Sequence, residues 1–94
     1  MNLSLPYLEI LYNSRIDFSF HYANLVKHNV SPDEVEQALD DPNGWSEKSI
    51  GGTYMHLGKT AQGRLLETGY RKLTATSAFV FHANGRARQS AKTL

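Results

Sequence analysis

The sequence lacks cysteine altogether, and it also lacks any long hydrophobic run. Without cysteine the chain cannot form a disulfide framework or a zinc–thiolate site. No apolar segment approaches the roughly 20 residues that a membrane-spanning helix needs. The first residues are broken by Pro6, Glu9 and Asn13 and carry no basic leader, so they make a poor signal peptide. These absences predict a cytoplasmic protein without a membrane segment.

The length and composition are those of one small domain. The chain has 94 residues, of which 40% are hydrophobic and 11% aromatic, which is enough for a modest core. We find no repeat, linker or low-complexity tract. We therefore expect residues 1–94 to form a single domain, in which residues 83–94 are a basic tail that is either a frayed helix or flexible.

Positive charge is concentrated in the second part of the chain, although the net charge is only +1. Residues 1–58 contain three basic and eight acidic residues, whereas residues 59–94 contain seven basic residues and one acidic residue. Such a chain can present a cationic face to a polyanion or to an acidic protein. The structural alternative is a domain whose oppositely charged parts attract each other.

The clearest helix signal begins at Ser31. Ser31 and Glu34 have capping-box spacing, and Pro32 occupies the first helical position. The helix is predicted over residues 32–40 and ends in a turn at residues 41–44, where Asp, Pro, Asn and Gly follow one another. Its buried stripe is Val35, Ala38 and Leu39.

Two further segments lie before this helix. Residues 20–28 are predicted to be helical, with Asn29 as the C-terminal stop because asparagine tolerates the left-handed conformation. Residues 4–13 fit a short helix capped by Ser4, but residues 8–12 fit a strand equally well.

After residue 44 the hydrophobic period changes to two, which predicts strands. Short connections between them indicate an antiparallel meander, and the amphipathic helices must cover one of its faces. The sequence therefore predicts an α+β fold. The strands are expected near residues 45–50, 53–59, 64–70 and 74–82, with turns at 51–52, 60–63 and 71–73.

The second hairpin carries two cations. Lys59 lies just before the turn and Arg64 just after it, while Gly63 suits a position with positive φ. Such a hairpin suits phosphate binding, because arginine can hold a phosphate with two parallel hydrogen bonds. Its structural alternative is a solvated loop.

Three segments together resemble the BrnT family, the toxin half of a bacterial type II toxin–antitoxin pair. They are residues 24–31 (Asn-Leu-Val-Lys-His-Asn-Val-Ser) followed by Glu34, Glu36 and residues 41–42; residues 57–70 around Leu-Gly-Lys-Thr and Gly-Arg-Leu-Leu; and residues 80–83 (Val-Phe-His-Ala). The likeness covers roughly residues 18–88 and leaves residues 1–17 outside it. No single segment is specific, and it is their order and spacing that resemble the family.

This resemblance implies a RelE-like α+β fold, with two or three helices packed on a roughly four-stranded antiparallel sheet. It also implies a small endoribonuclease without a metal or other cofactor. The implied partners are RNA and a cognate antitoxin that carries a DNA-binding domain, and the pair would repress its own operon. A homodimer within the toxin–antitoxin assembly is part of the same expectation.

The chain departs from the family pattern where chemistry matters. Thr53 and Asn84 stand where the family usually has arginine, and Ser90 stands where a glutamate is usual. Gly85 and Arg86 also replace the usual residues. These departures favour an alternative reading, in which the chain is a catalytically degenerate relative that binds an antitoxin or a regulator.

Cleavage of RNA without a metal needs a base for the 2′-OH, an acid for the leaving 5′-oxygen, and cations around the phosphorane. Histidine titrates near neutral pH and suits the first two roles, which makes His28, His56 and His82 candidates. The catalytic residues predicted are Arg64, His82 and His28, and the residues predicted to bind RNA or phosphate are Lys59, Lys27, Tyr70, Arg86 and Arg88.

Each candidate also has a structural reading. Lys27 and His28 fall in the last turn of a helix, where cations offset the dipole. His82 ends an apolar strand, and Tyr70 fits sheet packing as well as base stacking. The catalytic reading requires Lys59, Arg64 and His82 to converge on a single pocket.

Two other functions are disfavoured. The four histidines, at positions 21, 28, 56 and 82, lack the spacing of a metal site, so we expect no bound metal. Direct DNA binding is disfavoured because the clearest helix, residues 32–40, is acidic and would be repelled by phosphate.

Overall fold

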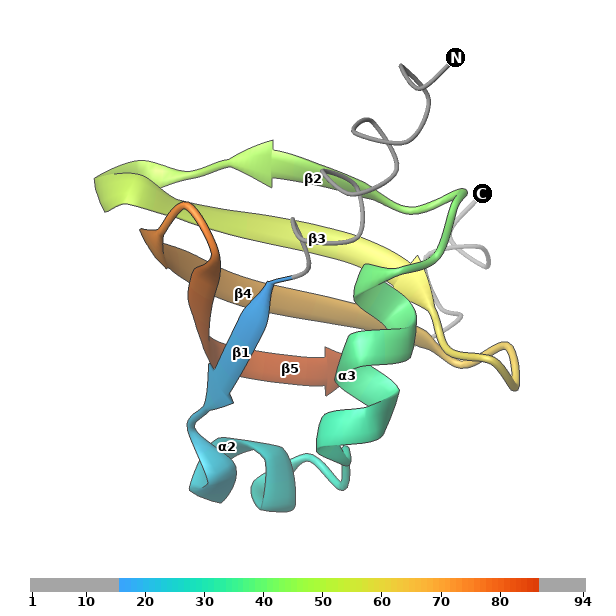
Figure 1. Cartoon of the computed structure of the whole chain (residues 1–94). Coiled ribbons are helices and arrows are strands. Elements are labelled where there is room, and N and C mark those ends of the chain that lie inside the picture. Colours follow the sequence, from blue (N-terminus) through green and yellow to red (C-terminus); the bar gives the residue numbers. More distant parts are fainter. Residues whose placement is uncertain (1–15, 87–94) are drawn as a thin grey trace, which may run out of the picture.

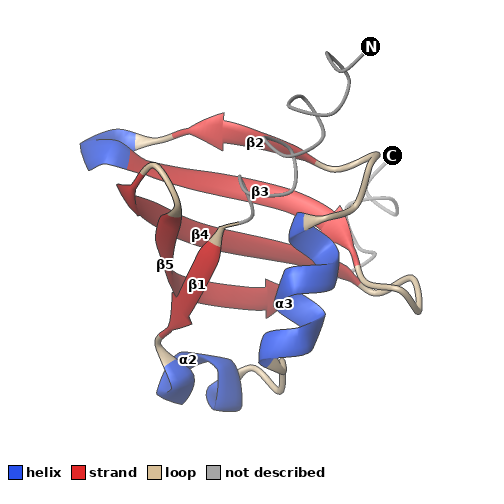
Figure 2. Ribbon diagram, in the orientation of Figure 1, coloured by secondary structure: helices blue, strands red, loops and turns tan. Residues whose placement is uncertain are grey.

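The computed structural model describes residues 16–86, which form a five-stranded sheet and two helices (Figure 1). Helix α3 lies across one face of the sheet, and α2 lies beside the end of β1 (Figure 2). The elements are β1 (Asp17–Phe20), α2 (Tyr22–Lys27), α3 (Pro32–Leu39), β2 (Trp45–Lys48), a 3₁₀ turn (Ile50–Gly52), β3 (Thr53–Lys59), β4 (Leu65–Thr74) and β5 (Ser77–Gly85).

The sheet has the strand order β1-β5-β4-β3-β2 and is mixed. Strands β2 to β5 form the predicted antiparallel meander, whereas β1 pairs with β5 in parallel. The α+β prediction is confirmed, but a four-stranded, purely antiparallel sheet was wrong. The sequence did not reveal β1, because a strand of only four residues has little periodicity and its partner lies about 60 residues further along the chain.

Both predicted helices between residues 20 and 44 are confirmed. In α3 the Glu34 N–H donates to Ser31 Oγ at 3.1 Å, and the Ser31 N–H donates to Glu34 Oε1 at 3.0 Å, which completes the capping box. Helix α2 ends before Asn29, which has the expected positive φ of 56°. It begins two residues later than predicted because Phe20 belongs to β1.

The turns are only partly as predicted. The connections at residues 51–52 and 60–63 are confirmed, and Gly63 has a φ of +87°. The turn at 71–73 was wrong, because β4 continues to Thr74 and the chain reverses at residues 75–76. Residues 71–76 are all exposed, so this end of the ladder lacks the alternation that signals a strand.

Strand β5 also runs further than predicted. It extends to Gly85, and Ala83 is completely buried, so the predicted tail from residue 83 was wrong for residues 83–85. The helix or strand predicted within residues 4–13, and residues 87–94 of the predicted tail, lie outside the described residues. That the whole chain is one domain stays a prediction.

The core lies between α2, α3 and the sheet. Its buried members are Leu25, Val30, Val35, Ala38, Leu66, Val80 and Ala83, with Phe18, Phe20, Leu39 and Tyr70 packed against them. Each fully buried valine or leucine among them contributes roughly 1.5–3 kcal/mol. Close approach of α3 to β3 requires Gly58, because a Cβ there would meet the Ala38 carbonyl oxygen and lie 2.7 Å from His56 Nε2. Neither described helix is long and apolar enough to cross a membrane.

Candidate functional site

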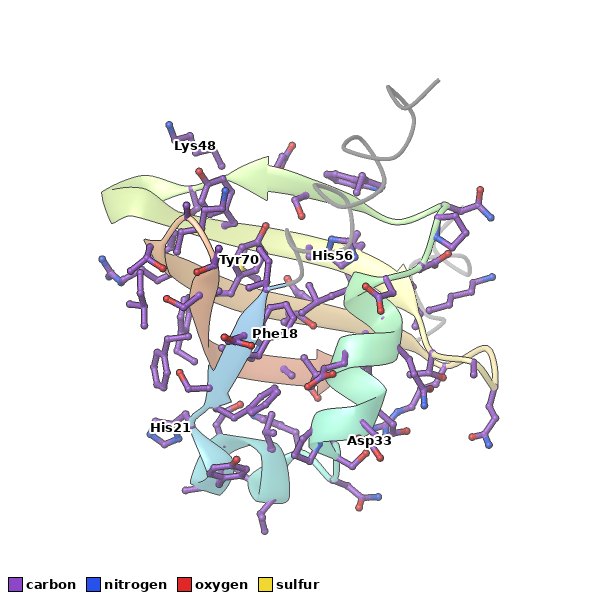
Figure 3. The ribbon with its side chains drawn as sticks, in the orientation of Figure 1. Phe18, His21, Asp33, Lys48, His56 and Tyr70 are labelled. Carbon is purple, nitrogen blue, oxygen red and sulfur yellow. The ribbon has the colours of Figure 1, made fainter. Side chains whose placement is uncertain are left out.

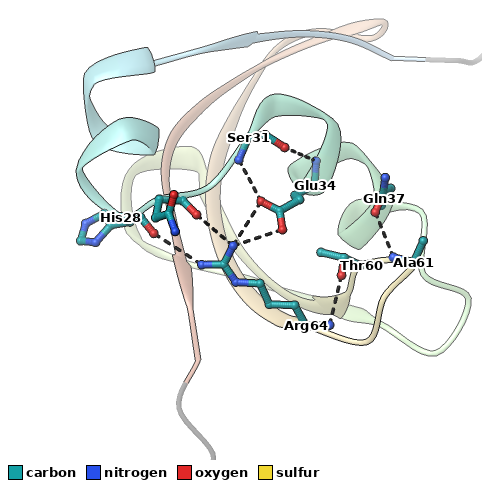
Figure 4. Close-up of polar contacts among 8 residues, drawn as sticks. His28, Ser31, Glu34, Gln37, Thr60, Ala61 and Arg64 are labelled. Atoms are coloured by element: carbon teal, nitrogen blue, oxygen red, sulfur yellow. Dashed lines mark hydrogen bonds and ion pairs between the residues drawn. The ribbon is translucent and has the colours of Figure 1, made fainter.

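Arg64 connects the start of β4 to the loop between the two helices (Figure 4). Its Nη1 donates to the Asn29 carbonyl at 2.9 Å and to both Glu34 carboxylate oxygens at 3.1 Å. Among the described residues, its Nη2 has only a long contact, 3.5 Å, with the His28 carbonyl. Arg64 is thus a structural clamp whose side chain is 34% exposed. Within residues 16–86 its Nη2 has no partner at ordinary hydrogen-bond distance.

The two histidines predicted to be catalytic lie side by side. The ring centroids of His28 and His82 are 5.6 Å apart with an edge-to-face angle of 75°, and both side chains are half-buried. His28 follows α2 directly, and its carbonyl is the one that faces Arg64 Nη2. The structure therefore brings the rings of His28 and His82 together, and Arg64 reaches the backbone carbonyl of His28 but not its ring (Figure 4). We call these three residues the His–Arg cluster.

Lys59 does not join this cluster. In the β3–β4 ladder Lys59 pairs with Leu65, while its neighbour Gly58 pairs with buried Leu66 beneath α3. Arg64 lies opposite Thr60, which puts it on the α3 side of the turn. Since successive side chains of a strand point to opposite faces, Lys59 faces away from Arg64. The prediction that Lys59, Arg64 and His82 share one pocket was wrong for Lys59, and no contact between Arg64 and the His82 ring is present among the described residues.

The remaining predicted contacts are dispersed. Lys27 is exposed in the last turn of α2, and Arg86 lies 3.9 Å from Glu67 in a partly exposed ion pair. Thr53, one of the two residues that depart from the resemblance at an arginine position, donates its hydroxyl to the Ile50 carbonyl and closes a turn. Arg88 and Ser90 lie outside the described residues.

Tyr70 and the third histidine of the sequence, His56, belong to a separate polar chain (Figure 3). Tyr70 donates its hydroxyl to Ser46 Oγ at 3.3 Å, and Ser46 Oγ is 2.8 Å from His56 Nδ1. His56 Nε2 lies 2.9 Å from the Ala38 carbonyl, an acceptor, so Nε2 carries the proton and Nδ1 accepts from Ser46.

This polar chain fixes α3 on the sheet. His56 is only 5% exposed and has both ring nitrogens hydrogen-bonded, so it has no free nitrogen for acid–base chemistry. The ring of Tyr70 stacks on Tyr54 with centroids 5.2 Å apart, which is sheet packing. His56, Ser46 and Tyr70 also line a hollow of about 670 Å³ between α3 and β1. No sequence pattern indicated this network, because it is the β2–β3 register that brings Ser46 opposite His56.

Two carboxylates near these elements are held in their charged form. The pKa of Glu34 is lowered, first by the Ser31 backbone N–H and then by Arg64, against an opposing effect of burial. The pKa of Asp41 is lowered by the backbone N–H groups of Asn43 and Lys59. Within residues 16–86 no group of three or more histidine and carboxylate side chains is arranged to hold a metal ion.

Comparison with known proteins gives one informative likeness. No family model matches the sequence, and no curated protein matches it. The structure is similar to the crystal structure, at 1.1 Å resolution, of the ribonuclease toxin BrnT from Brucella abortus, with a TM-score of 0.62 over 79% of this chain and 97% of that one. The sequences are 13% identical, so the likeness shows a BrnT-like α+β fold.

Proposed function

We propose that the protein is a BrnT-like toxin that cleaves RNA without a metal, and that the His–Arg cluster is its active site. The observation that supports this best is the pair of half-buried imidazoles, 5.6 Å apart, together with a partly exposed arginine whose Nη2 lies 3.5 Å from the backbone carbonyl of His28. Two neighbouring imidazoles suit the acid and base roles of RNA cleavage near neutral pH. The BrnT-like fold adds support that does not depend on the geometry of these side chains.

In this proposal one histidine removes the proton from the 2′-OH as the 2′-oxygen attacks phosphorus. The bond from phosphorus to the 5′-oxygen breaks, and the other histidine gives that oxygen a proton. The products are a 2′,3′-cyclic phosphate and a free 5′-OH. His82 is proposed as the main acid or base, with His28 as its counterpart.

Arg64 is proposed to contribute Nη2 to the phosphate while Nη1 stays on Glu34 and the Asn29 carbonyl. Arg86, Lys27 and Lys59 are proposed to contact RNA backbone outside the cluster, where cations of exposed side chains add affinity without base specificity. The proposed substrate is bacterial RNA in the cytoplasm, and the proposed partner is an antitoxin with a DNA-binding domain.

The test uses the purified chain, a fluorescent single-stranded RNA and excess EDTA. We expect cleavage with cyclic phosphate ends, and none of an all-deoxy strand of the same sequence. His82→Ala and His28→Gln should each lower the rate by about 10²–10⁴. Arg71→Ala is the matched control for Arg64→Ala, because Arg71 is exposed and its side chain bonds only the Gly51 carbonyl among residues 16–86. Absence of cleavage by the unmodified chain, or full activity of His82→Ala, would contradict the proposal.

One observation favours a second function. Arg64 has its charge offset by Glu34, and Thr53 is engaged in a turn where the family has arginine. A toxin relative that lacks free arginines at these two positions would act as a binding module for an antitoxin or a regulator. Expression in bacteria without any partner separates the two functions, because growth arrest supports the nuclease and normal growth supports the binding module.

A further inference from the structure

Strand β5 loses its neighbour on one side halfway along its length. The parallel pairing with β1 ends at Phe20 and Val80, whereas β5 continues to Gly85. Beyond Val80 the outer edge of β5 is covered by α2 instead of a strand. His82 lies in this part of β5, next to a register shift in the ladder with β4, so regular strand pairing on both sides does not fix its position.

A side chain of α2 takes the place of the missing strand. Asn24 Oδ1 accepts a hydrogen bond from the Ala83 N–H at 3.1 Å. Ala83 is completely buried, so its N–H would have no access to water if this acceptor were removed. A buried donor without a partner is unfavourable, and the contact therefore fixes β5 against α2 at the residue after His82.

The backbone of the same asparagine fixes the other histidine. The His28 N–H donates to the Asn24 carbonyl at 3.2 Å, one helical turn further along. The start of the turn is held as well, since His21 Nδ1 accepts from the Asn24 N–H. The backbone carbonyl of Asn24 thus accepts from His28, and its side-chain oxygen accepts from Ala83, the residue after His82. It also joins two of the three segments that carry the family resemblance, residues 24–31 and 80–83.

We infer that Asn24 is a positioning residue that holds the His28 and His82 rings together through its bond to the Ala83 N–H. The catalytic meaning of this inference rests on the proposed function, whereas its geometric part stands without it. The side chain of Asn24 need not touch RNA for this role, because it acts on the two histidines through the backbone.

The geometric test is nuclear magnetic resonance on the full chain. The unmodified protein should show a cross-relaxation signal between the ring protons of His28 and His82. Asn24→Leu removes the acceptor and should abolish this signal and speed hydrogen exchange of the Ala83 amide by about tenfold. Asn24→Asp keeps an oxygen acceptor and should retain both the signal and the slow exchange.

Two controls separate positioning from general loss of structure. The stacked rings of Tyr54 and Tyr70 should keep their mutual signal in Asn24→Leu, and Asn43→Leu, in an exposed turn, should change nothing. The inference is overturned if Asn24→Leu keeps the histidine signal, or if Asn24→Asp loses it as Asn24→Leu does. If Asn24→Leu does not fold, the result for Asn24→Asp decides.

The catalytic test measures RNA cleavage by the same variants. Asn24→Leu should lower kcat by about tenfold or more with little change in KM, because misplacement of acid and base affects the reaction more than substrate binding. Asn24→Asp should restore kcat. If the unmodified chain cleaves no RNA, the proposed function fails while the resonance experiment still decides the geometry. If it cleaves RNA and kcat of Asn24→Leu is unchanged, the positioning role fails alone.

Discussion

Replacing Arg64 by alanine should destabilise the protein even in the absence of RNA, because Arg64 joins the α2–α3 loop to β4. Its ion pair with Glu34 is partly exposed on both sides, 34% and 26%, so it contributes about 0.2–1 kcal/mol. The charged hydrogen bond to the Asn29 carbonyl adds about 0.5–1 kcal/mol, since water can replace the lost donor at this exposed carbonyl. We expect Arg64→Ala to lower the free energy of unfolding by about 1–2 kcal/mol.

A double-mutant cycle with Glu34→Gln isolates the ion pair. Glutamine keeps an oxygen for the Ser31 N–H, so the capping box survives while the charge is lost. Urea unfolding followed by circular dichroism should give a coupling energy of about 0.5–1 kcal/mol between the two positions. In thermal unfolding Arg64→Ala should lower Tm by roughly 5–15 °C.

Arg71→Ala is the control, and its unfolding free energy should stay within about 0.5 kcal/mol of the unmodified chain. The reasoning is refuted if Arg64→Ala unfolds like the control, or if the coupling energy is zero within error. Either result would mean that Arg64 is free to serve RNA binding alone. The expected result means that nuclease assays of Arg64→Ala must be made well below its Tm.

The remaining predictions concern two side chains of α3 and β4. Because the pKa of Glu34 is lower in the folded chain than its ordinary value of 4.5, its contribution to stability is present above that pH and is lost as the pH falls through the folded pKa. As the pH is lowered below 4.5, the urea concentration at the unfolding midpoint should therefore fall less for Glu34→Gln than for the unmodified chain. Equal dependence of the midpoint on pH in the two proteins would contradict this. Thr68 is completely buried, and its hydroxyl has no hydrogen-bond partner in the part of the chain that the structure describes, so Thr68→Val should be neutral or stabilise by up to about 1 kcal/mol. A loss of more than about 1 kcal/mol in the same assay would show that the hydroxyl has a partner.

The site was predicted from the sequence only in part, and the hairpin cations show why. Lys59 and Arg64 are close in sequence, and both precede or follow the same turn. Whether two such side chains meet depends on which residues of the two strands pair with each other. Lys59 pairs with Leu65 and therefore shares a face with it, so Lys59 and Arg64 lie on opposite faces of the sheet. Composition and spacing do not specify this pairing register.

The sequence alone determined those features that depend on interactions between residues close together in the chain. The capping box at Ser31, the positive φ of Asn29 and the turn closed by Gly63 involve residues within four positions of one another. The hydrophobic period of two likewise predicted strands β2 to β4. It failed at the end of β4 and the turn after it, because residues 71–76 are exposed on both faces.

Tertiary structure decided what depends on partners distant along the chain. Strand β1 exists through its pairing with β5, His56 is a structural residue through Ser46 and Ala38, and Arg64 is a clamp through Glu34. The physical reason is that hydrogen bonds and ion pairs form wherever the folded chain brings complementary groups within about 3 Å, and sequence separation does not limit that distance. The neighbouring rings of His28 and His82 arise in the same way, from the docking of α2 on β5.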